Sequence, residues 1–361
     1  MAGKPLSEGT VYEALRGVQD PHHQRSILSL NIVRSLIVRD GGVLLVVALL
    51  RPEPSYRETL EREIRAAIGK LDGVREFDLK FDLGAPAGQR LPQKEPIRGV
   101  KHLIAVASGK GGVGKTTVAV NLAVALAKMG ASVGLLDADV YGPNVPVMLG
   151  TTETPRALAE NAIVPVMAHG VKIISMGLLN PGDRPLVWRG PMLHGVVQQF
   201  LRSVQWGELE YLIADLPPGT GDVQLSLVQS AVISGAVIVT TPSIVALADV
   251  RKAIEMFRQV NVEILGVVEN MSYFACPHCN GRIDVFGHGE GARMAKTFGV
   301  PFLGEIEIDP QIRIGGDSGK PVAVEGEDSP GAKSVYAVAR NVAARIAELG
   351  RSASAPVVQI L

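Results

Sequence analysis

The sequence predicts an α/β fold in which helices cover both faces of a mainly parallel sheet, preceded by a small α/β domain. The first reason is that near-continuous Val/Ile/Leu runs alternate with helical segments, as in parallel sheets that are buried on both faces. The second is that 361 residues with 47% hydrophobic content can fill the cores of about two domains. Ligands in such sheets bind beyond the carboxyl ends of the strands, so we expect the functional residues there.

The small domain is predicted over residues 1–83. Two strand-like runs, Val33 to Val38 and Val43 to Leu49, flank the hairpin turn signal Asp40-Gly41. A final strand is predicted from Val74 to Phe81. A helix before it is predicted by apolar residues at helical spacing: Leu60, Ile64, Ala67, Ile68 and Leu71.

A proline-containing stretch without apolar periodicity follows, and it predicts a linker over residues 84–99. The large domain is then expected over residues 100–350, with a flexible tail at 351–361. Its first strand is His102 to Ala107, and its first helix runs from Lys115 to Met129, with Gly130 where a helix ends. Five further strands are predicted: Ser132 to Asp137, Val171 to Met176, Tyr211 to Asp215, Ala236 to Thr241 and Ile264 to Val268.

Composition argues against several classes of function. Thirty-six basic and 36 acidic residues balance, and aromatic residues are only 4%, so neither a nucleic-acid partner nor base-stacking platforms are expected. The longest apolar run, Val43 to Leu50, is far shorter than the about 20 residues of a membrane span. The chain opens with no secretory leader, and two cysteines form no disulfide framework. We therefore expect a cytoplasmic protein without a membrane partner.

The segment from Gly109 to Thr116 fits the phosphate-binding pattern G-x-x-x-x-G-K-[ST], between a strand and a helix. Glycines allow backbone N–H groups to approach phosphate oxygens, Lys115 neutralises phosphate charge, and Thr116 offers a hydroxyl to Mg²⁺. The alternative is that this segment is a glycine-rich turn that binds no phosphate. Lys110 is a second lysine inside the loop, and it either serves bound phosphates, its own or those of a second subunit, or is a solvated surface lysine.

Carboxylates follow two of the predicted strands. Asp215 ends an apolar strand, the usual position of an Mg²⁺-associated carboxylate in P-loop NTPases. Asp139 or Asp137 is placed to orient the attacking water, and Gly219 and Gly221 supply flexible N–H donors for sensing the γ-phosphate, as in a switch loop. Helix capping is the alternative role for each aspartate.

Cys276 and Cys279 form the only thiol pair, in a C-x-x-C arrangement that provides half of a four-ligand metal site. His278 and His288 are candidates to complete a Zn²⁺ site. A symmetric dimer would instead supply two more thiolates from a second copy. Redox-active thiols or inert thiols are the remaining alternatives, although Pro277 suggests a turn instead of the helix start of a thioredoxin-type pair.

Taken together, these motifs resemble the Mrp/ApbC/Nbp-type iron–sulfur cluster carrier ATPases, which are P-loop NTPases of the deviant-Walker-A class. The resemblance covers about residues 100–345. It is carried by five segments: GKGGVGKTT at 109–117, DADVYGPN at 137–144, DLPPGTGD at 215–222, ENMSYF at 269–274 with CPHC at 276–279, and DP at 309–310 with GDSG at 316–319.

The resemblance implies an ATP-hydrolysing homodimer that passes an iron–sulfur cluster from scaffold proteins to apo iron–sulfur proteins. Lys110 would reach nucleotide across the dimer interface, Asp139 would lie in switch I and Asp215 in switch II. Cys276 and Cys279, with their symmetry mates, would bridge one 4Fe–4S cluster. The catalytic set is then Lys110, Lys115, Asp139 and Asp215, and Thr116 and Asp215 would hold Mg²⁺. ATP would contact Gly109, Lys110, Gly111, Gly112, Val113, Gly114, Lys115, Thr116, Thr117 and, through adenine, Asn270.

Residues 1–83 resemble the small iron–sulfur-assembly domain that often precedes such ATPases, on the strength of Asp20-Pro21 and the order of elements. His22-His23 stands where such domains usually have glutamate, and residues 50–55 read LRPEPS without the usual cysteine. A docking or regulatory role is therefore expected in place of thiol chemistry. Two other functions are kept as alternatives: a Min/Par-type spatial-organising ATPase, and an ATPase with a purely structural Zn²⁺ site.

Overall fold

The computed structural model describes residues 6–23, 25–30, 32–39, 41–49, 53–82, 94–139, 142–159, 162–179, 190–219, 222–243, 246–279, 281–329 and 331–354. The chain divides into two compact units, Met1–Pro92 and Gln93–Leu361. Most of the predicted linker, residues 84–93, lies outside the described residues, as does the end of the predicted tail, 355–361. Residues 351–354 continue the last helix.

The first unit is a three-stranded sheet with two helices. Its strands lie in the order β1–β2–β3, with β1 and β2 antiparallel and β2 and β3 parallel, so α2 forms the crossover between the parallel pair. The predicted hairpin is confirmed, although Asp40 itself lies outside the described residues. The elements are α1 (Glu8–Leu15), β1 (Val33–Arg39), β2 (Gly42–Ala48), α2 (Pro54–Ile68) and β3 (Glu76–Asp82).

The core of this unit forms between α2 and the sheet. Tyr56, Leu60, Ile64 and Ile68 are buried at every fourth position of α2, which is the helical spacing that places side chains on one face. The predicted helix ends earlier than its apolar pattern, since Leu71 follows the end of α2.

A buried carboxylate lies beside this core. Asp20 is fully buried and accepts a 2.5 Å hydrogen bond from the Tyr56 hydroxyl, together with bonds from the backbone N–H groups of His22 and His23. Burial raises the pKa of Asp20, but the hydrogen bonds from Tyr56 and His23 outweigh it, and the pKa lies below its usual value. Asp20 of the Asp20-Pro21 motif is therefore part of the internal structure of this unit, while Pro21 is exposed.

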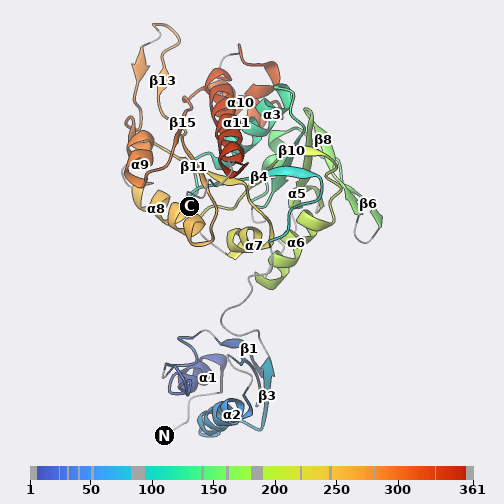
Figure 1. The fold of residues 1–361 in the computed structure, drawn as a ribbon, viewed down its shortest axis with the longest axis vertical. Helices are drawn as coiled ribbons and strands as arrows, with labels where there is room; N and C mark the ends of the chain where they lie inside the picture. Colours follow the sequence, from blue (N-terminus) through green and yellow to red (C-terminus); the bar gives the residue numbers. More distant parts are fainter. Residues whose placement is uncertain are drawn as a thin grey trace, which may run out of the picture. The chain divides into compact units, whose positions relative to one another are not determined.

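The second unit is built on an eight-stranded sheet with the order β15–β12–β11–β4–β10–β5–β9–β8 (Figure 1). All neighbouring pairs are parallel except β8 with β9 at one edge, so the predicted mainly parallel sheet is confirmed. The strands are β4 (Val100–Ala107), β5 (Val133–Asp137), β8 (Val166–Ala168), β9 (Val171–Ser175), β10 (Leu209–Asp215), β11 (Gly235–Thr240), β12 (Ile264–Glu269) and β15 (Phe302–Glu305).

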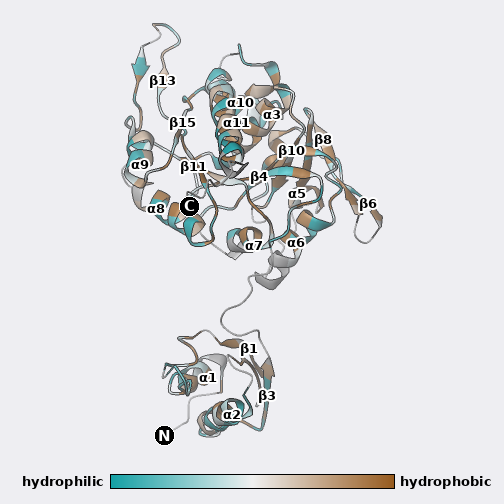
Figure 2. Ribbon diagram, viewed as in Figure 1, coloured by the Kyte–Doolittle hydropathy of each residue, from teal (hydrophilic) through white to brown (hydrophobic). Residues whose placement is uncertain are grey.

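Helices cover both faces of this sheet. On β4, Leu103 and Ala105 belong to a core shared with α6, α7, α8 and α9, whereas Ile104 and Val106 belong to a core shared with α3, α10 and α11. The strands of this sheet contribute hydrophobic side chains to both cores (Figure 2). The helices are α3 (Lys115–Lys128), α6 (Gly190–Arg202), α7 (Asp222–Ser230), α8 (Ala246–Gln259), α9 (Glu290–Phe298), α10 (Pro310–Asp317) and α11 (Lys333–Ser354).

The second unit also contains several shorter helices and strands. Three hairpins were not predicted, β6 with β7, β8 with β9, and β13 with β14, and the last of them carries the cysteine pair. These elements are α4 (Val145–Met148), α5 (Met176–Leu179), β6 (Arg156–Ala159), β7 (Ala162–Val164), β13 (Phe274–Ala275), β14 (Arg282–Ile283) and the 3₁₀ helix η1 (Val322–Glu325).

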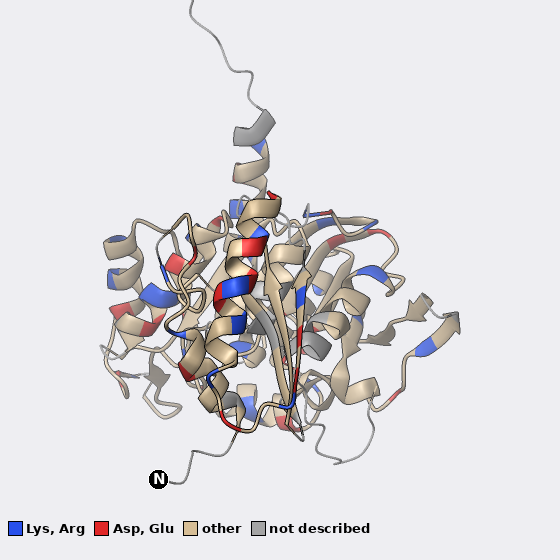
Figure 3. Ribbon diagram, turned by 90° about the horizontal axis from the view of Figure 1, so that it is seen from below, with Lys and Arg blue, Asp and Glu red and all other residues tan. Residues whose placement is uncertain are grey.

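Basic and acidic residues are mixed along the fold, in keeping with the formal net charge of zero. Lys and Arg are interspersed with Asp and Glu along the ribbon in Figure 3, and no element carries a long run of one sign. Across the described part of the chain, every helix is too short or too polar to cross a bilayer.

Candidate functional site

The phosphate-binding loop lies between the end of β4 and the start of α3, as predicted. Gly112 and Gly114 adopt left-handed backbone conformations, with φ of 79° and 76°. Gly114 also has no room for a side chain, because a Cβ atom there would lie 2.2 Å from Nδ2 of Asn270. That amide donates a 2.8 Å hydrogen bond to the carbonyl of Val113, so Asn270 holds the loop directly.

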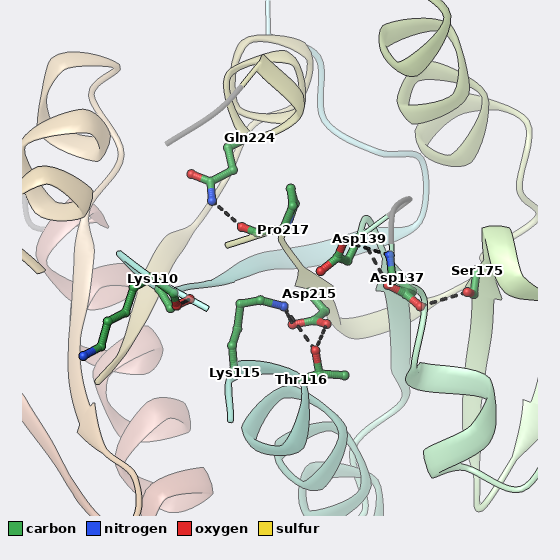
Figure 4. Close-up of polar contacts among 11 residues, drawn as sticks. Lys110, Lys115, Thr116, Asp137, Asp139, Ser175, Asp215, Pro217 and Gln224 are labelled. Carbon is green, nitrogen blue, oxygen red and sulfur yellow. Dashed lines mark hydrogen bonds and ion pairs between the residues drawn. The ribbon is translucent and has the colours of Figure 1, made fainter. Parts of the chain in front are cut away.

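Lys115, Thr116 and Asp215 form a compact cluster at the base of the loop (Figure 4). The Lys115 ammonium lies 2.6 Å from Oδ1 of Asp215, and the Thr116 hydroxyl donates a 2.7 Å hydrogen bond to Oδ2. Lys115 is only 6% exposed and Asp215 is fully buried. The ion pair keeps both charges compensated inside the protein, where an unpaired charge would be costly.

Two aspartates at neighbouring strand ends differ in their exposure. Asp137 is buried, and it accepts hydrogen bonds from the Ser175 hydroxyl (2.8 Å) and from the backbone N–H of Asp139 (3.1 Å). Burial, with the nearby Asp215 adding to it, raises the pKa of Asp137 to about 8. Burial also raises the pKa of Asp215, while Lys115 opposes that rise. Asp139, in contrast, lines a cavity.

That cavity has a volume of about 750 Å³ and opens above the loop. One wall consists of the loop itself, from Lys110 to Thr117, with Asp139 and Asn270. The other lining residues are of two kinds. The apolar ones are Val147, Met148, Met271, Phe286, Ile308 and Ile312, and the polar and charged ones include Asn144, Glu307, Asp309, Arg313 and Asp317. A cavity that combines a polar phosphate-binding loop with apolar side chains suits a nucleotide, which has a charged end and a flat aromatic base.

Lys110 and the loop after β10 complete the predicted site residues. The ammonium of Lys110 points away from the Lys115–Asp215 cluster in Figure 4. The backbone N–H of Gly219 donates to the carbonyl of Ser108 at 3.0 Å, which ties this loop to the phosphate-binding loop. Buried Gln224, which the sequence did not single out, donates to the carbonyl of Pro217 at 2.5 Å. Gly221 lies outside the described residues.

The cysteine pair lies in the turn of the β13–β14 hairpin. Cys276 is half-buried, Cys279 is exposed, and the backbone N–H of Cys276 donates to the carbonyl of Gly281 at 3.0 Å. Hydrogen bonds from the backbone N–H of His278, and then of Cys279, lower the pKa of the Cys276 thiol. A lowered pKa favours the thiolate, the form that binds metals.

The histidine completion of a Zn²⁺ site is not assembled within the described part of one chain. His288 instead lies with Glu269 and Glu305, whose ligand atoms are all within 4.8 Å of one another. Its Nδ1 also contacts the Arg282 guanidinium, which pairs with Glu305 at 3.2 Å. His288 is therefore a member of an ion-pair cluster beside the hairpin.

Comparisons with known proteins match both units. A family model described as NUBPL iron-transfer P-loop NTPase matches residues 99–343, and one described as iron–sulfur cluster assembly protein matches residues 8–79. The iron–sulfur cluster carrier protein of Synechocystis sp. is 45% identical over 346 residues, which cover 94% of this chain and 98% of that protein. The iron–sulfur cluster transfer protein NUBPL of Dictyostelium discoideum is 48% identical over 267 residues, 73% of this chain and 83% of the other.

Solved structures agree with the fold. The nucleotide-binding protein of Archaeoglobus fulgidus in complex with ADP has 41% sequence identity and a TM-score of 0.57, over 66% of this chain and 93% of its own. The cell division ATPase MinD of Pyrococcus furiosus has 26% identity and a TM-score of 0.51, over 67% and 98%. The phosphate-binding loop, the carboxylates at the strand ends and the family match over residues 99–343 agree, and the chain belongs to the NUBPL iron-transfer P-loop NTPases.

Proposed function

We propose that this protein is an ATP-dependent iron–sulfur cluster carrier. A homodimer holds one 4Fe–4S cluster between the thiolates of Cys276 and Cys279 from each copy and transfers it to apo-proteins, and ATP hydrolysis switches between holding and release. The observation that carries the proposal is the C-x-x-C pair, with Cys279 exposed and the pKa of the Cys276 thiol lowered, on the same unit as a complete phosphate-binding loop. The identity of 45% over 94% of the chain to a named carrier favours this function over a Min/Par-type role.

The nucleotide half of the mechanism uses the charges at the base of the loop. The backbone N–H groups from Gly109 to Thr117 bind the phosphates of ATP, and Lys115 moves from Asp215 to the phosphate oxygens. Asp139 at the cavity surface orients the water for attack on the γ-phosphate. Lys110, whose ammonium points away from this centre, reaches the nucleotide of the second copy.

The donor set suits Mg²⁺. Hard oxygen ligands are what this ion prefers, and Thr116 and Asp215 already bring a hydroxyl and a carboxylate oxygen to 2.7 Å of each other. These two residues would hold the ion, and when bound it supplies charge neutralisation to the transferring phosphoryl group.

The cluster half rests on an incomplete ligand set. Among the described residues, no third Cys, His, Asp or Glu ligand atom gathers with the two thiols within 4.8 Å. Because a four-iron cluster needs about four ligands, a second copy related by a two-fold axis is the simplest source of the missing pair. Scaffold proteins would supply the cluster and apo iron–sulfur proteins in the cytoplasm would receive it, with the first unit serving in docking or regulation.

Anaerobic reconstitution with iron and sulfide tests the proposal. We expect about four irons and four sulfides per dimer, visible thiolate-to-iron absorption, and loss of both in Cys276→Ala with Cys279→Ala. His278→Ala, between the cysteines, is the matched control and should keep the cluster. Iron retained by the double cysteine variant would refute the proposal, and so would stoichiometric Zn²⁺ with no iron in protein purified without oxygen.

A further inference from the structure

The cysteine hairpin and the phosphate-binding loop are joined by a very short piece of chain. Asn270 contacts the loop, and Cys276 follows it by six positions. At the loop end, Asn270 is 5% exposed, and its side-chain amide donates a hydrogen bond to the Val113 carbonyl at 2.8 Å and fills the space beside Gly114. A shift of the Val113–Gly114 backbone therefore displaces Asn270.

The residues around Asn270 form a fixed turn. The Ser272 hydroxyl donates to Oε1 of Glu269 at 2.6 Å, and the backbone N–H of Gly291 donates to Oε2 at 2.5 Å. Glu269 and Ser272 are both fully buried, and Met271 between them has a φ of 55°, in the left-handed region that non-glycine residues rarely adopt. Such a turn moves as one piece, because bending it would break buried hydrogen bonds.

Arg282 fixes the hairpin to the end of this turn. Its guanidinium lies 4.1 Å from the ring centre of Tyr273, a cation–π contact. On the other side it pairs with Asp284 at 2.9 Å and with Glu305 of β15 at 3.2 Å. Because Arg282 lies opposite Ala275 in the β13–β14 ladder, these contacts hold the strand that leads into Cys276.

The same guanidinium explains the cluster of Glu269, His288 and Glu305. Three such groups within 4.8 Å could suit a metal ion, but Arg282 contacts both His288 and Glu305. The Arg282 guanidinium, from the hairpin, therefore supplies the positive charge that the carboxylates of this cluster attract. The cluster thus helps to attach the hairpin to the rest of the unit.

We infer that Arg282 is a positioning residue, which fixes the cysteine hairpin to the Glu269–Tyr273 turn so that nucleotide in the phosphate-binding loop changes the accessibility of Cys276 and Cys279. The inference rests on the proposed function and names the connection through which its switch acts. A nucleotide shifts the hairpin only if it favours one arrangement of this connection over another.

The rate at which the reduced, cluster-free thiols are alkylated measures the connection without any cluster. Full-length protein is compared without nucleotide, with Mg²⁺-ADP and with a non-hydrolysable Mg²⁺-ATP analogue. In the wild type we expect the analogue to change the rate by about fivefold or more, the lower end of ordinary coupling between two sites. In Arg282→Gln the rate should become nearly independent of nucleotide, while the affinity for the analogue stays within about twofold of wild type.

Matched variants separate positioning from a general loss of structure. Arg293→Gln removes an exposed arginine on α9 that pairs with Glu290 and does not contact the hairpin among the described residues, and it should behave as wild type. Arg282→Lys keeps the charge without the planar group and should restore part of the nucleotide dependence. Thermal unfolding checks that all variants fold.

Three outcomes overturn the inference. The first is that nucleotide changes the alkylation rate in Arg282→Gln as much as in wild type. The second is that Arg293→Gln loses the nucleotide effect as fully as Arg282→Gln, and the third is that nucleotide does not change the alkylation rate of the wild type. The first would mean that the second copy shields the thiols directly. In each case, anaerobic cluster binding by the wild type decides separately whether the proposed carrier function survives.

Discussion

Replacing Gly114 by alanine should damage the phosphate-binding loop through a single contact. The backbone at Gly114 is left-handed, with a φ of 76°, and a Cβ atom would lie 2.2 Å from Nδ2 of Asn270. Gly112 provides the matched control, since its φ is 79° and a Cβ atom there meets no other atom within 4 Å. The two substitutions therefore share the backbone strain and differ in the clash.

The strain of a left-handed alanine costs about 1–2 kcal/mol, which is the whole effect expected for Gly112→Ala. In Gly114→Ala the Asn270 amide must also leave the Val113 carbonyl. Loss of a buried hydrogen bond with both partners unsatisfied costs about 1–3 kcal/mol more. Gly114→Ala should therefore lower the free energy of unfolding by about 2–5 kcal/mol.

Denaturant unfolding followed by tryptophan fluorescence measures this difference. Both tryptophans of the chain, Trp188 and Trp206, belong to the second unit, so the signal reports that unit. With Asn270→Ala as the background, the excess cost of Gly114→Ala over Gly112→Ala should disappear, because the clashing atom is gone. Equal costs for the two glycine variants in the wild-type background would refute the reasoning.

Three further predictions concern buried carboxylates. Tyr56→Phe removes the 2.5 Å bond to Asp20 and should cost the first unit about 1.5–3 kcal/mol at pH 7. Because the pKa of Asp20 is lowered in the folded state, its stabilisation is present above the unfolded value of about 3.9 and is lost on further acidification, so calorimetry should show the variant approaching wild type below about pH 4. Asp137, with its pKa raised to about 8, keeps a proton that the unfolded chain loses, so stability without nucleotide should fall by up to about 1.4 kcal/mol per pH unit between about pH 4 and 8. Asp137→Asn should have a smaller difference in stability between pH 5 and pH 8 than wild type, since only buried Asp215, whose pKa is also raised, still contributes, and an unchanged difference would assign the slope to another group. Thr116→Val removes a 2.7 Å donor to Asp215 and should lower stability by about 1.5–3 kcal/mol and weaken Mg²⁺-dependent ATP binding, whereas Thr116→Ser should preserve both in titration calorimetry.

Local patterns in the sequence were sufficient to predict the parallel sheet and the phosphate-binding loop. Strands such as Leu209–Asp215 are buried on both faces, so their apolar runs are continuous and easily recognised. The glycines, Lys115 and Thr116 lie within eight residues, and their chemistry depends on that local spacing. The positions of the carboxylates could also be predicted, because the carboxyl ends of parallel strands lie at one edge of the sheet.

Contacts between distant segments could not be predicted in this way. Val113 and Asn270 are 157 residues apart, and only the order of β4, β11 and β12 brings them together. The cluster around Arg282 likewise depends on β15 lying beside β12, and the short β15 was not recognised as a strand. The apolar side chains that line the cavity come from α4, from loops and from α10, and they fit no motif, although the DP and GDSG segments at 309–310 and 316–319 lie at the two ends of α10.

The first unit encloses its own hydrophobic core, which draws on residues from Val11 to Ile68, while the buried clusters of the second unit begin at Ile97. Within the described residues, the two sets of core side chains do not overlap. A gene could therefore gain or lose the first segment by fusion or deletion without removing any of these core side chains from the second unit. Expressed as separate polypeptides, the two halves should each reach a folded state.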